Sequence, residues 1–269
     1  MILDDLSASA RKRIEKEKEK LSYDGIRDLA EQKMADGYKN TAEKYSGAYP
    51  FEKALKSKNL SIIAEVKKAS PSKGIIANDF PYLSIAEEYE DAGADAISCL
   101  TEPDYFKGSD KYLNEIAAKV KTPVLRKDFT VDPYMIYQAK LYGASAVLLI
   151  ASILSDSQMK EYFGIADKLG ISCLFEAHDE EEVKRVIAAG ARIVGVNNRN
   201  LKDFTVDIEN SIRLRKLVPP EIKFVSESGI KNPSDIIMLK ENGTDAVLIG
   251  EMLMRSSKKK HLIKELKEI

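Results

Sequence analysis

The sequence predicts an α/β fold, a (β/α)₈ TIM barrel with an N-terminal helical extension. Eight short apolar runs follow one another after residue 60, and a polar turn and a helix-like stretch separate each run from the next. The runs are almost continuously apolar, as in parallel strands that are buried on both faces. The sequence has no glycine-rich dinucleotide turn, which disfavours an open, doubly wound sheet. Eight such units are the repeat of a closed parallel barrel.

The expected strands are short and follow one another at similar intervals. They lie at 61–66, 95–100, 123–129, 145–150, 171–177, 192–197, 223–228 and 245–250. Between them, apolar residues recur at i, i+3 and i+4, and most of these stretches end in glycine, a common helix stop. The last segment, SSKKKHLIKELKEI, predicts a final amphipathic helix.

Residues 1–48 stand outside this repeat. We expect them to form a helical extension to a barrel of residues 49–269, the two parts making a single domain overall. The charge run RKRIEKEKEK predicts a helix with a solvated charged side and Ile14 on another face. The extension is either a plain addition or a cap over one mouth of the barrel.

Composition and charge exclude several classes of function. The chain has 269 residues and a formal net charge of −1, so it has no basic surplus to attract nucleic acid or an anionic membrane. The start of the chain lacks the apolar core of a signal peptide, and the longest apolar run, 146–154, is too short to cross a bilayer. We expect a cytoplasmic monomer without nucleic-acid or membrane partners.

Cysteine and histidine are too few to suggest a metal site. Cys99 and Cys173 lie inside apolar runs, where they are expected to be small core side chains. His178 and His261 are the only histidines, which disfavours a histidine-rich metal centre. We therefore expect no metal, and we expect lysine and carboxylate groups to carry any acid–base chemistry.

Charged or amide side chains end five of the eight expected strands. Catalytic groups in a TIM barrel come from the carboxyl ends of its strands, and residues two apart on a strand share a face. Glu65 and Lys67 share a face of the first strand, and Lys127 and Phe129 share a face of the third. The other such strand ends carry Glu176, Asn197 with Arg199, and Glu227. Because strand interiors exclude unpaired charge, five such ends in register predict one site.

Two glycines after the last two strands predict a phosphate site. Gly229 follows the seventh strand in SESGI, and Gly250 ends the eighth in LIGE. Glycine lets backbone N–H groups approach an anion at a helix N-terminus, and these two loops hold a phosphate in many TIM barrels. SPSKG, residues 70–74, adds hydroxyls and Lys73 to the same rim. We expect a phosphorylated small-molecule substrate.

Six motifs also carry a resemblance. EVKKASPSKG, LRKDF, LFEAHDEEE, GVNNRNL, SESGI and LIGEMLMR, in this order and spacing over about residues 50–256, resemble the indole-3-glycerol phosphate synthase family. The resemblance implies a (β/α)₈ barrel with an N-terminal helical extension. It implies closure of 1-(o-carboxyphenylamino)-1-deoxyribulose 5-phosphate to the indole ring of indole-3-glycerol phosphate, with loss of CO₂ and water, in tryptophan biosynthesis. It also implies a carboxy-lyase without a cofactor, since decarboxylation itself restores aromaticity.

The resemblance implies a role for each candidate residue. The catalytic groups would be Lys127, Glu176, Glu65 and Lys67. The groups that bind and orient the substrate would be Asn197, Arg199, Glu227 and Ser228. The aryl pocket would be lined by Phe106, Phe129, Leu148 and Leu201. The phosphate would be held by Ser70, Gly229, Gly250 and Glu251.

Two of these roles need a physical qualification. Lys127 would be the general acid at the substrate carbonyl, but whether Lys67 or Lys127 is the second acid, and which carboxylate is the base in the dehydration, is left open. Glu251 stands where some family members carry serine, so its backbone N–H, and not its carboxylate, is expected to face the phosphate.

Two alternatives remain beside this interpretation. A barrel like phosphoribosylanthranilate isomerase would share the phosphate end, but it would need a cysteine or aspartate acid–base pair at the strand ends, where this chain has Glu65 and Lys67. A non-catalytic phosphate-binding barrel would explain the two glycines but would leave Lys127 and Glu176 without a purpose.

Overall fold

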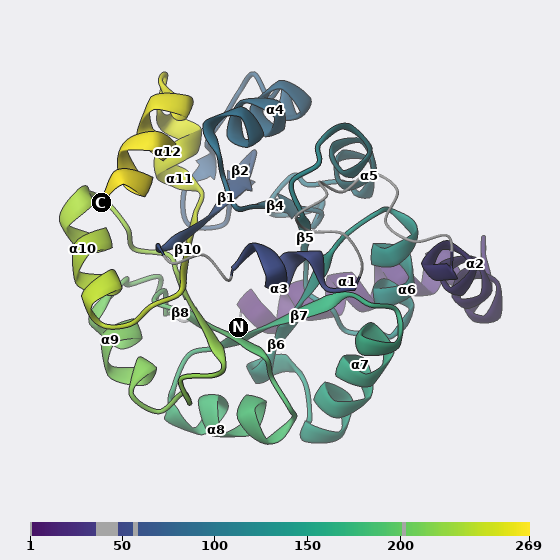
Figure 1. Cartoon of the computed structure of the whole chain (residues 1–269). Helices are drawn as coiled ribbons and strands as arrows, with labels where there is room; N and C mark the ends of the chain where they lie inside the picture. The colour runs from purple at the N-terminus through teal and green to yellow at the C-terminus, as the bar shows by residue number, and fades with distance from the viewer. Residues whose placement is uncertain (1, 36–47, 56–58, 201–202) are drawn as a thin grey trace.

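Eight parallel strands form a closed ring in the computed structural model of the chain, which describes residues 2–35, 48–55, 59–200 and 203–269 (Figure 1). In chain order the strands are β1 (Ser61–Val66), β4 (Ala96–Leu100), β5 (Val124–Lys127), β6 (Ala146–Ile150), β7 (Ser172–Ala177), β8 (Ile193–Asn197), β9 (Lys223–Glu227) and β10 (Ala246–Ile249). Each strand pairs with the next, and β10 closes the ring on β1. The predicted TIM barrel and its eight strands are confirmed.

Helices surround the ring of strands (Figure 1). They are α4 (Tyr82–Ala92), α5 (Asp110–Lys119), α6 (Tyr134–Leu141), α7 (Asp156–Lys168), α8 (Glu180–Ala188), α9 (Glu209–Arg215), α10 (Pro233–Glu241), α11 (Glu251–Arg255) and α12 (Lys259–Glu268). Local sequence sets their ends: Ser155 begins α7 with a reciprocal capping box, and Gly93 ends α4 in the left-handed conformation. The final helix, α12, is the one that the sequence predicts.

Two apolar layers hold the barrel together. One fills the inside of the ring, and the other lies between the strands and the outer helices. In β1, Ile63 belongs to the inner layer, whereas Ile62 and Ala64 belong to the outer one. Since side chains alternate along a strand, Glu65 points inward like Ile63. The predicted core positions of Cys99 and Cys173 are confirmed, since both are buried and free.

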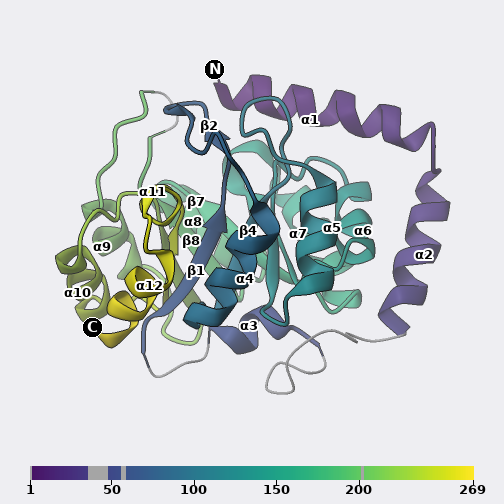
Figure 2. The same cartoon turned by 90° about the horizontal axis from the view of Figure 1, so that it is seen from above.

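A short helix, α3 (Pro50–Ala54), closes the end of the ring where the strands begin (Figure 2). Phe51 is fully buried and packs, with Leu55, on the inner apolar layer. Burying a phenylalanine side chain in this way stabilises the fold by about 1.5–3 kcal/mol. With this end filled, the carboxyl ends of the strands are where a ligand can enter.

Two helices of the N-terminal extension, α1 (Ile2–Lys18) and α2 (Tyr23–Ala35), lie outside the ring. α1 crosses the carboxyl ends of the strands, opposite α3 (Figure 2). Ion pairs hold it there: Arg13 Nη2 lies 2.7 Å from Asp128 Oδ2, and Lys18 Nζ lies 2.7 Å from Asp132 Oδ2. Ile14 is on the buried face of this helix, as the sequence predicts. Of the two interpretations of the extension, this arrangement supports the cap.

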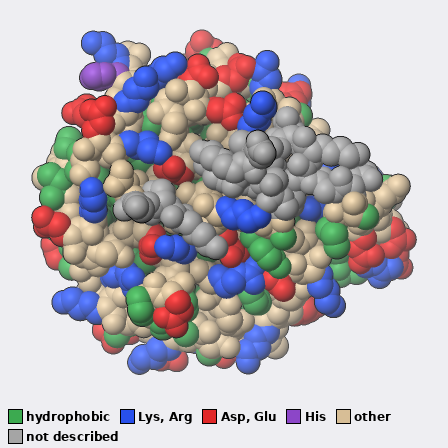
Figure 3. Space-filling view, in the orientation of Figure 1, with side chains coloured by type: hydrophobic (Ala, Val, Ile, Leu, Met, Phe, Trp, Pro, Cys, Tyr) green, Lys and Arg blue, Asp and Glu red, His purple; other side chains and the backbone are tan. Residues whose placement is uncertain are grey.

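The division of the chain after residue 48 stays a prediction, because residues 36–47 lie outside the part that the structure describes. On the face that carries α3, acidic and basic side chains are interspersed (Figure 3). Within the described ranges, no helix is long and apolar enough to cross a membrane. The sequence did not predict the small antiparallel hairpin that β2 (Ala69–Ser70) and β3 (Gly74–Ile75) form inside the loop after β1, nor the short helix α3.

Candidate active site

A cavity of about 620 Å³ lies at the carboxyl ends of the strands, beneath α1. Its walls come from most strands of the barrel, from the loops that follow them, and from Ile2, Leu3 and Leu6 of α1. Of the predicted site residues in the described part of the chain, those that line it are Glu65, Lys67, Ser70, Phe106, Lys127, Phe129, Leu148, Glu176, Asn197, Arg199, Glu227, Ser228, Gly229, Gly250 and Glu251. Leu201 lies outside the described residues.

Four charged side chains form one layer across the barrel. Glu65, Lys127, Glu176 and Glu227 stand on β1, β5, β7 and β9, which are alternate strands of the ring. Alternate strands supply the side chains of one layer in a TIM barrel, so this topology brings the four together. Lys127 Nζ lies 2.8 Å from Glu176 Oε2 and 3.1 Å from Glu227 Oε2. The ammonium group therefore bridges two buried carboxylates.

A second ion pair joins Glu65 to Lys67, and a glycine makes room for it. A Cβ atom at Gly250 would collide with the Glu65 carboxylate and would lie 2.8 Å from Lys67 Nζ. Gly250 is thus required by the charged pair, in addition to the phosphate role expected from the sequence. Gly195 on β8 makes room for Glu227 in the same way: the Glu227 carboxylate occupies the space that a side chain at position 195 would fill.

The pKa values of the cluster differ strongly. Burial opposes the charged form of Lys127, but the carboxylates of Glu176, Glu227 and Glu65 outweigh it and raise the pKa of the ammonium. Burial also opposes ionisation of Glu176, yet Lys127 and His178 hold the pKa of its carboxyl well below the ordinary range. Burial, opposed by Lys127 and helped by Glu176, raises the pKa of Glu227 to about 7. At neutral pH the site holds a protonated acid and an ionised base side by side.

Amide and guanidinium groups complete this side of the cavity. Asn197 Nδ2 donates a hydrogen bond to Glu176 Oε1 at 3.2 Å, and Asn197 Oδ1 accepts one from the backbone N–H of Arg199 at 3.0 Å. The Arg199 guanidinium donates to the carbonyl of Phe204 at 3.2 Å. Asn197 therefore orients Glu176, and Arg199 is held at the cavity wall.

The opposite wall is apolar. The rings of Phe106 and Phe129 lie 6.3 Å apart, with their planes inclined by 43°. Leu148 and Ile150 of β6 continue this surface toward the barrel interior. Together with the apolar residues of α1, it is a suitable environment for an aromatic ring.

The third part of the cavity wall follows β9 and β10. Ser228 and Gly229 both have positive φ, 65° and 91°, which turns the chain sharply after β9. The Glu251 carboxylate accepts a hydrogen bond from Arg255 Nε at 3.0 Å, so it is paired within its own helix. Lys231 and Arg255 also line this end. Neither cation was predicted: Lys231 directly follows SESGI, and Arg255 ends the short helix α11 that begins after Gly250.

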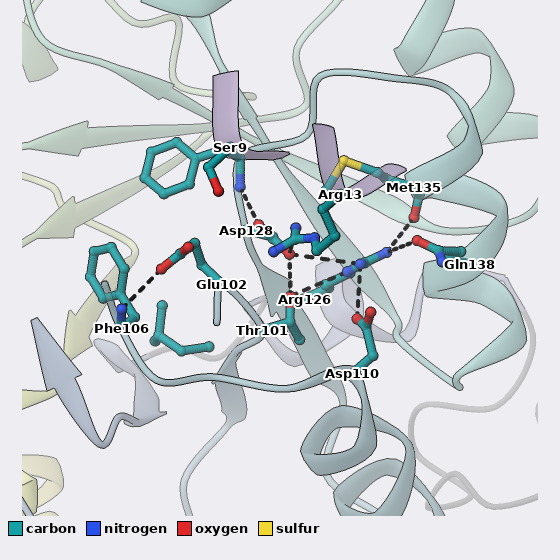
Figure 4. Close-up of polar contacts among 12 residues, drawn as sticks. Ser9, Arg13, Thr101, Glu102, Phe106, Asp110, Arg126, Asp128, Met135 and Gln138 are labelled. Carbon is teal, nitrogen blue, oxygen red and sulfur yellow. Dashed lines mark hydrogen bonds and ion pairs between the residues drawn. The ribbon is translucent and has the colours of Figure 1, made fainter. Parts of the chain in front are cut away.

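A buried polar network behind Lys127 was also missed (Figure 4). Asp128 accepts hydrogen bonds from Arg13 at 2.7 Å, from Thr101 at 2.6 Å and, through its other oxygen, from the Phe129 backbone N–H at 2.8 Å. Arg126 is paired with Asp110 at 2.8 Å. Since Arg126 and Asp128 flank Lys127 in sequence, this network fixes the end of β5 from outside the ring and ties it to α1.

The comparisons with known proteins identify relatives of this chain. A family model described as indole-3-glycerol phosphate synthase matches residues 3–266. A protein of that name from Ruminiclostridium cellulolyticum is 56% identical over 256 residues, which cover 95% of each chain. Another, from Leuconostoc mesenteroides subsp. mesenteroides, is 50% identical over 270 residues, covering 99% of each.

Solved structures with low sequence identity share the fold. 3-Hexulose-6-phosphate synthase from Salmonella typhimurium is 12% identical, with a TM-score of 0.64, and the match covers 78% of this chain and 97% of that one. 3-Keto-L-gulonate-6-phosphate decarboxylase from Vibrio cholerae is 14% identical, with a TM-score of 0.62 and the same coverage. These likenesses support the barrel and nothing finer.

Proposed function

The chain belongs to the indole-3-glycerol phosphate synthase family, decarboxylating lyases of tryptophan biosynthesis, and from that premise we propose how its cavity performs this reaction. The substrate, 1-(o-carboxyphenylamino)-1-deoxyribulose 5-phosphate, has an aryl ring, a ketone and a phosphate. The cavity has an apolar wall, a charged layer and a glycine-containing end, which suit these three parts in turn. The family match over nearly the whole chain leaves the two alternative barrels without support.

The observation that carries the proposal is the position of Lys127. Its ammonium lies between Glu176 and Glu227 on the floor of a cavity with an aromatic wall. Ring closure places negative charge on the ketone oxygen, and a positioned ammonium protonates that oxygen as it forms. The ring carbon that attacks also becomes part of a cationic, dearomatised ring, which a buried carboxylate stabilises. Loss of CO₂ then restores aromaticity.

Dehydration follows and needs a base and an acid. Glu176 is ionised and held by Lys127 and Asn197, so it is the base of this proposal, taking a proton from the carbon next to the ring nitrogen. The leaving hydroxyl takes a proton from Lys127 or from Lys67, whose ion pair with Glu65 lies in the same cavity. We assign Lys67 and Glu65 a supporting role in this step.

The remaining residues bind the substrate in this proposal. Phe106, Phe129 and Leu148 contact the aryl ring, and α1 covers it and keeps water out. The phosphate lies at Ser70, Gly229 and the backbone of Gly250 and Glu251, near Lys231 and Arg255. A phosphorylated small molecule is then the sole partner, and the enzyme acts in the cytoplasm as a monomer without a cofactor.

The test of the proposed function is a fluorescence assay. Purified protein and the aryl ribulose phosphate substrate, without added metal or cofactor, are expected to give indole-3-glycerol phosphate, which fluoresces as an indole. The same assay with product analysis by mass spectrometry reports the loss of CO₂ and water. Absence of product under these conditions would contradict the proposal.

Substitution of Arg199 by alanine is expected to act mainly on substrate binding. Its guanidinium lies at the cavity wall and carries a charge that suits the substrate carboxylate or phosphate, so its loss weakens ground-state and transition-state binding alike. We expect KM to rise by about ten-fold or more while kcat changes little. Steady-state kinetics measure both constants. A fall in kcat alone would instead assign Arg199 to transition-state stabilisation.

A further inference from the structure

His178 lies behind Glu176, between the active-site cavity and a second hollow. The second hollow has a volume of about 530 Å³ and is lined by His178, Glu182 and neighbouring residues of the loops after β7 and β8. Glu176 lines the active-site cavity and His178 lines the second hollow, while Asn197 and Arg199 line both. The imidazole therefore lies between the buried Glu176 and this second hollow.

The contacts of the imidazole form a continuous path. His178 Nε2 lies 3.4 Å from Glu176 Oε1, and His178 Nδ1 lies 3.0 Å from Glu182 Oε2. On the far side of Glu176, Oε2 lies 2.8 Å from Lys127 Nζ. Nε2 is buried and, within the described part of the chain, makes no hydrogen bond, so Glu176 is its nearest acceptor.

The backbone holds the ring in this position. The Glu182 carboxylate also accepts a hydrogen bond from the His178 backbone N–H at 2.9 Å, and Asn210 Nδ2 donates one to the His178 carbonyl at 3.0 Å. Glu182 stands in the first turn of α8, where a carboxylate is favoured by the helix dipole. The imidazole thus rests between two carboxylates, one on β7 and one on α8.

The reaction consumes one proton in each turnover. The ketone oxygen takes one proton when the ring closes, and the hydroxyl that results takes another when it leaves as water. The base removes one proton from the carbon next to the ring nitrogen. The substrate carboxylate, ionised at neutral pH, leaves as neutral CO₂ and neither gives nor takes a proton. Two protons are delivered and one is recovered, so one must enter from solvent.

The front of the cavity is a poor route for this proton. α1 lies over the mouth, and Ile2, Leu3 and Leu6 give that side an apolar lining. A bound substrate fills the space between α1 and Lys127, and the other near contacts of the ammonium are carboxylates of the buried layer. A proton that reaches Lys127 from the second hollow, through His178 and Glu176, passes neither α1 nor the bound substrate.

We propose that His178 and Glu182 form a proton relay that returns one proton per turnover from the second hollow, through Glu176, to Lys127. This inference rests on the proposed function. When Lys127 has given its proton to the substrate, His178 transfers its Nε2 proton to Glu176 Oε1, and Glu176 passes a proton from Oε2 to Lys127 Nζ. The neutral ring keeps its Nδ1 proton. It turns about its Cβ–Cγ bond, water in the second hollow returns a proton to Nε2, and Glu182 stabilises the imidazolium that forms. No other group gains or loses charge.

The pKa values of His178 and Lys127 favour proton transfer from the imidazolium to the lysine. Burial opposes the charged form of His178, but Glu176 and Glu182 outweigh it and raise the pKa of the imidazolium to about 10. The carboxylates around Lys127 raise the pKa of its ammonium further still. A neutral Lys127 therefore draws a proton from His178. The other charged groups that line the second hollow are Asp4, Asp179, Arg199 and Asp207.

The relay is tested by replacing His178 with alanine. The variant is expected to lose about ten-fold or more in kcat with little change in KM, because substrate binding does not use the imidazole. Added imidazole, which enters the space left by the side chain from the second hollow, is expected to restore kcat. A series of substituted imidazoles is expected to restore it to an extent that varies with the pKa of each, a dependence that a purely structural role would not produce.

Two further variants make the result decisive. Glu182→Gln keeps the shape of the relay but removes its outer carboxylate, so its kcat is expected to fall by about three-fold or more. His261→Ala, the same change at the only other histidine, which is exposed on α12, is the matched control and keeps wild-type kcat. Unchanged kcat in His178→Ala, or a loss that no imidazole restores, overturns the relay. If the wild-type protein forms no product, the proposed function fails, and the relay with it.

Discussion

Replacing Lys127 with alanine is expected to lower kcat by at least about 10²-fold, the usual effect of a positioned general acid. The ketone oxygen then develops its charge without a proton donor. The two carboxylates that share the ammonium, Glu176 and Glu227, lose their common partner. Glu176 keeps His178 beside it, but Glu227 becomes a buried anion without a counter-charge. Since an uncompensated buried charge is costly, the Glu227 carboxyl is expected to be protonated at neutral pH in the variant.

Steady-state kinetics and a proton titration of the variant measure these two effects. The fold is expected to persist, because the inner apolar layer lies below the charged one and is unchanged. Lys111→Ala, which removes an exposed lysine of α5, is the matched control and is expected to keep wild-type kcat. Turnover of Lys127→Ala close to that of the wild type would end the role proposed for this lysine.

Replacing Glu176 with glutamine is expected to reduce kcat by at least about 10²-fold as well, because an amide cannot accept the proton that dehydration removes. The change keeps the size of the side chain and leaves an oxygen that can accept the hydrogen bond from Lys127 or Asn197. A fall in kcat therefore measures the loss of a proton acceptor and of its negative charge, and not a change in packing. Glu181→Gln, on the exposed side of α8, is the control.

This variant also has an expected pH signature. Glu176 is the carboxylate that contributes most to raising the pKa of Lys127. Its removal lowers that pKa, so Lys127 loses its proton at a lower pH and the alkaline limb of the kcat profile moves to lower pH. A pH profile measured on both proteins tests this. An unchanged alkaline limb would show that Lys127 is not the group whose deprotonation limits the rate.

Much of the barrel was predictable because its signal is periodic. The pattern of an apolar strand followed by an amphipathic helix recurs along the chain, so several segments independently predict the same fold. The charged layer was predictable for a related reason. Glu65, Lys127, Glu176 and Glu227 stand where apolar strands end, and a charge at such a position has little structural use.

Other parts of the site depend on contacts that the sequence does not show. His178 is followed by DEEE, which indicates the capped start of a helix, and nothing in this pattern places the imidazole against Glu176. Arg13 belongs to a charge run that indicates a solvated face, yet its guanidinium is paired with Asp128, a fully buried aspartate directly after β5. Gly195 carries no motif, although the space it leaves is filled by Glu227. The contacts of Arg13 and Gly195 join segments that are distant in sequence, and that of His178 depends on how the chain turns after β7.

The position of α1 has a consequence for the order in which the molecule is made. On the ribosome, Arg13 emerges 115 residues before Asp128, its partner across the mouth of the barrel. α1 therefore spends the synthesis of two βα units and of β5 without its docking site, and its many charged residues keep it soluble in that interval. α1 is made before the barrel but reaches its final place only after β5 and the loop that follows it have formed, so the cavity gains its cover late in folding.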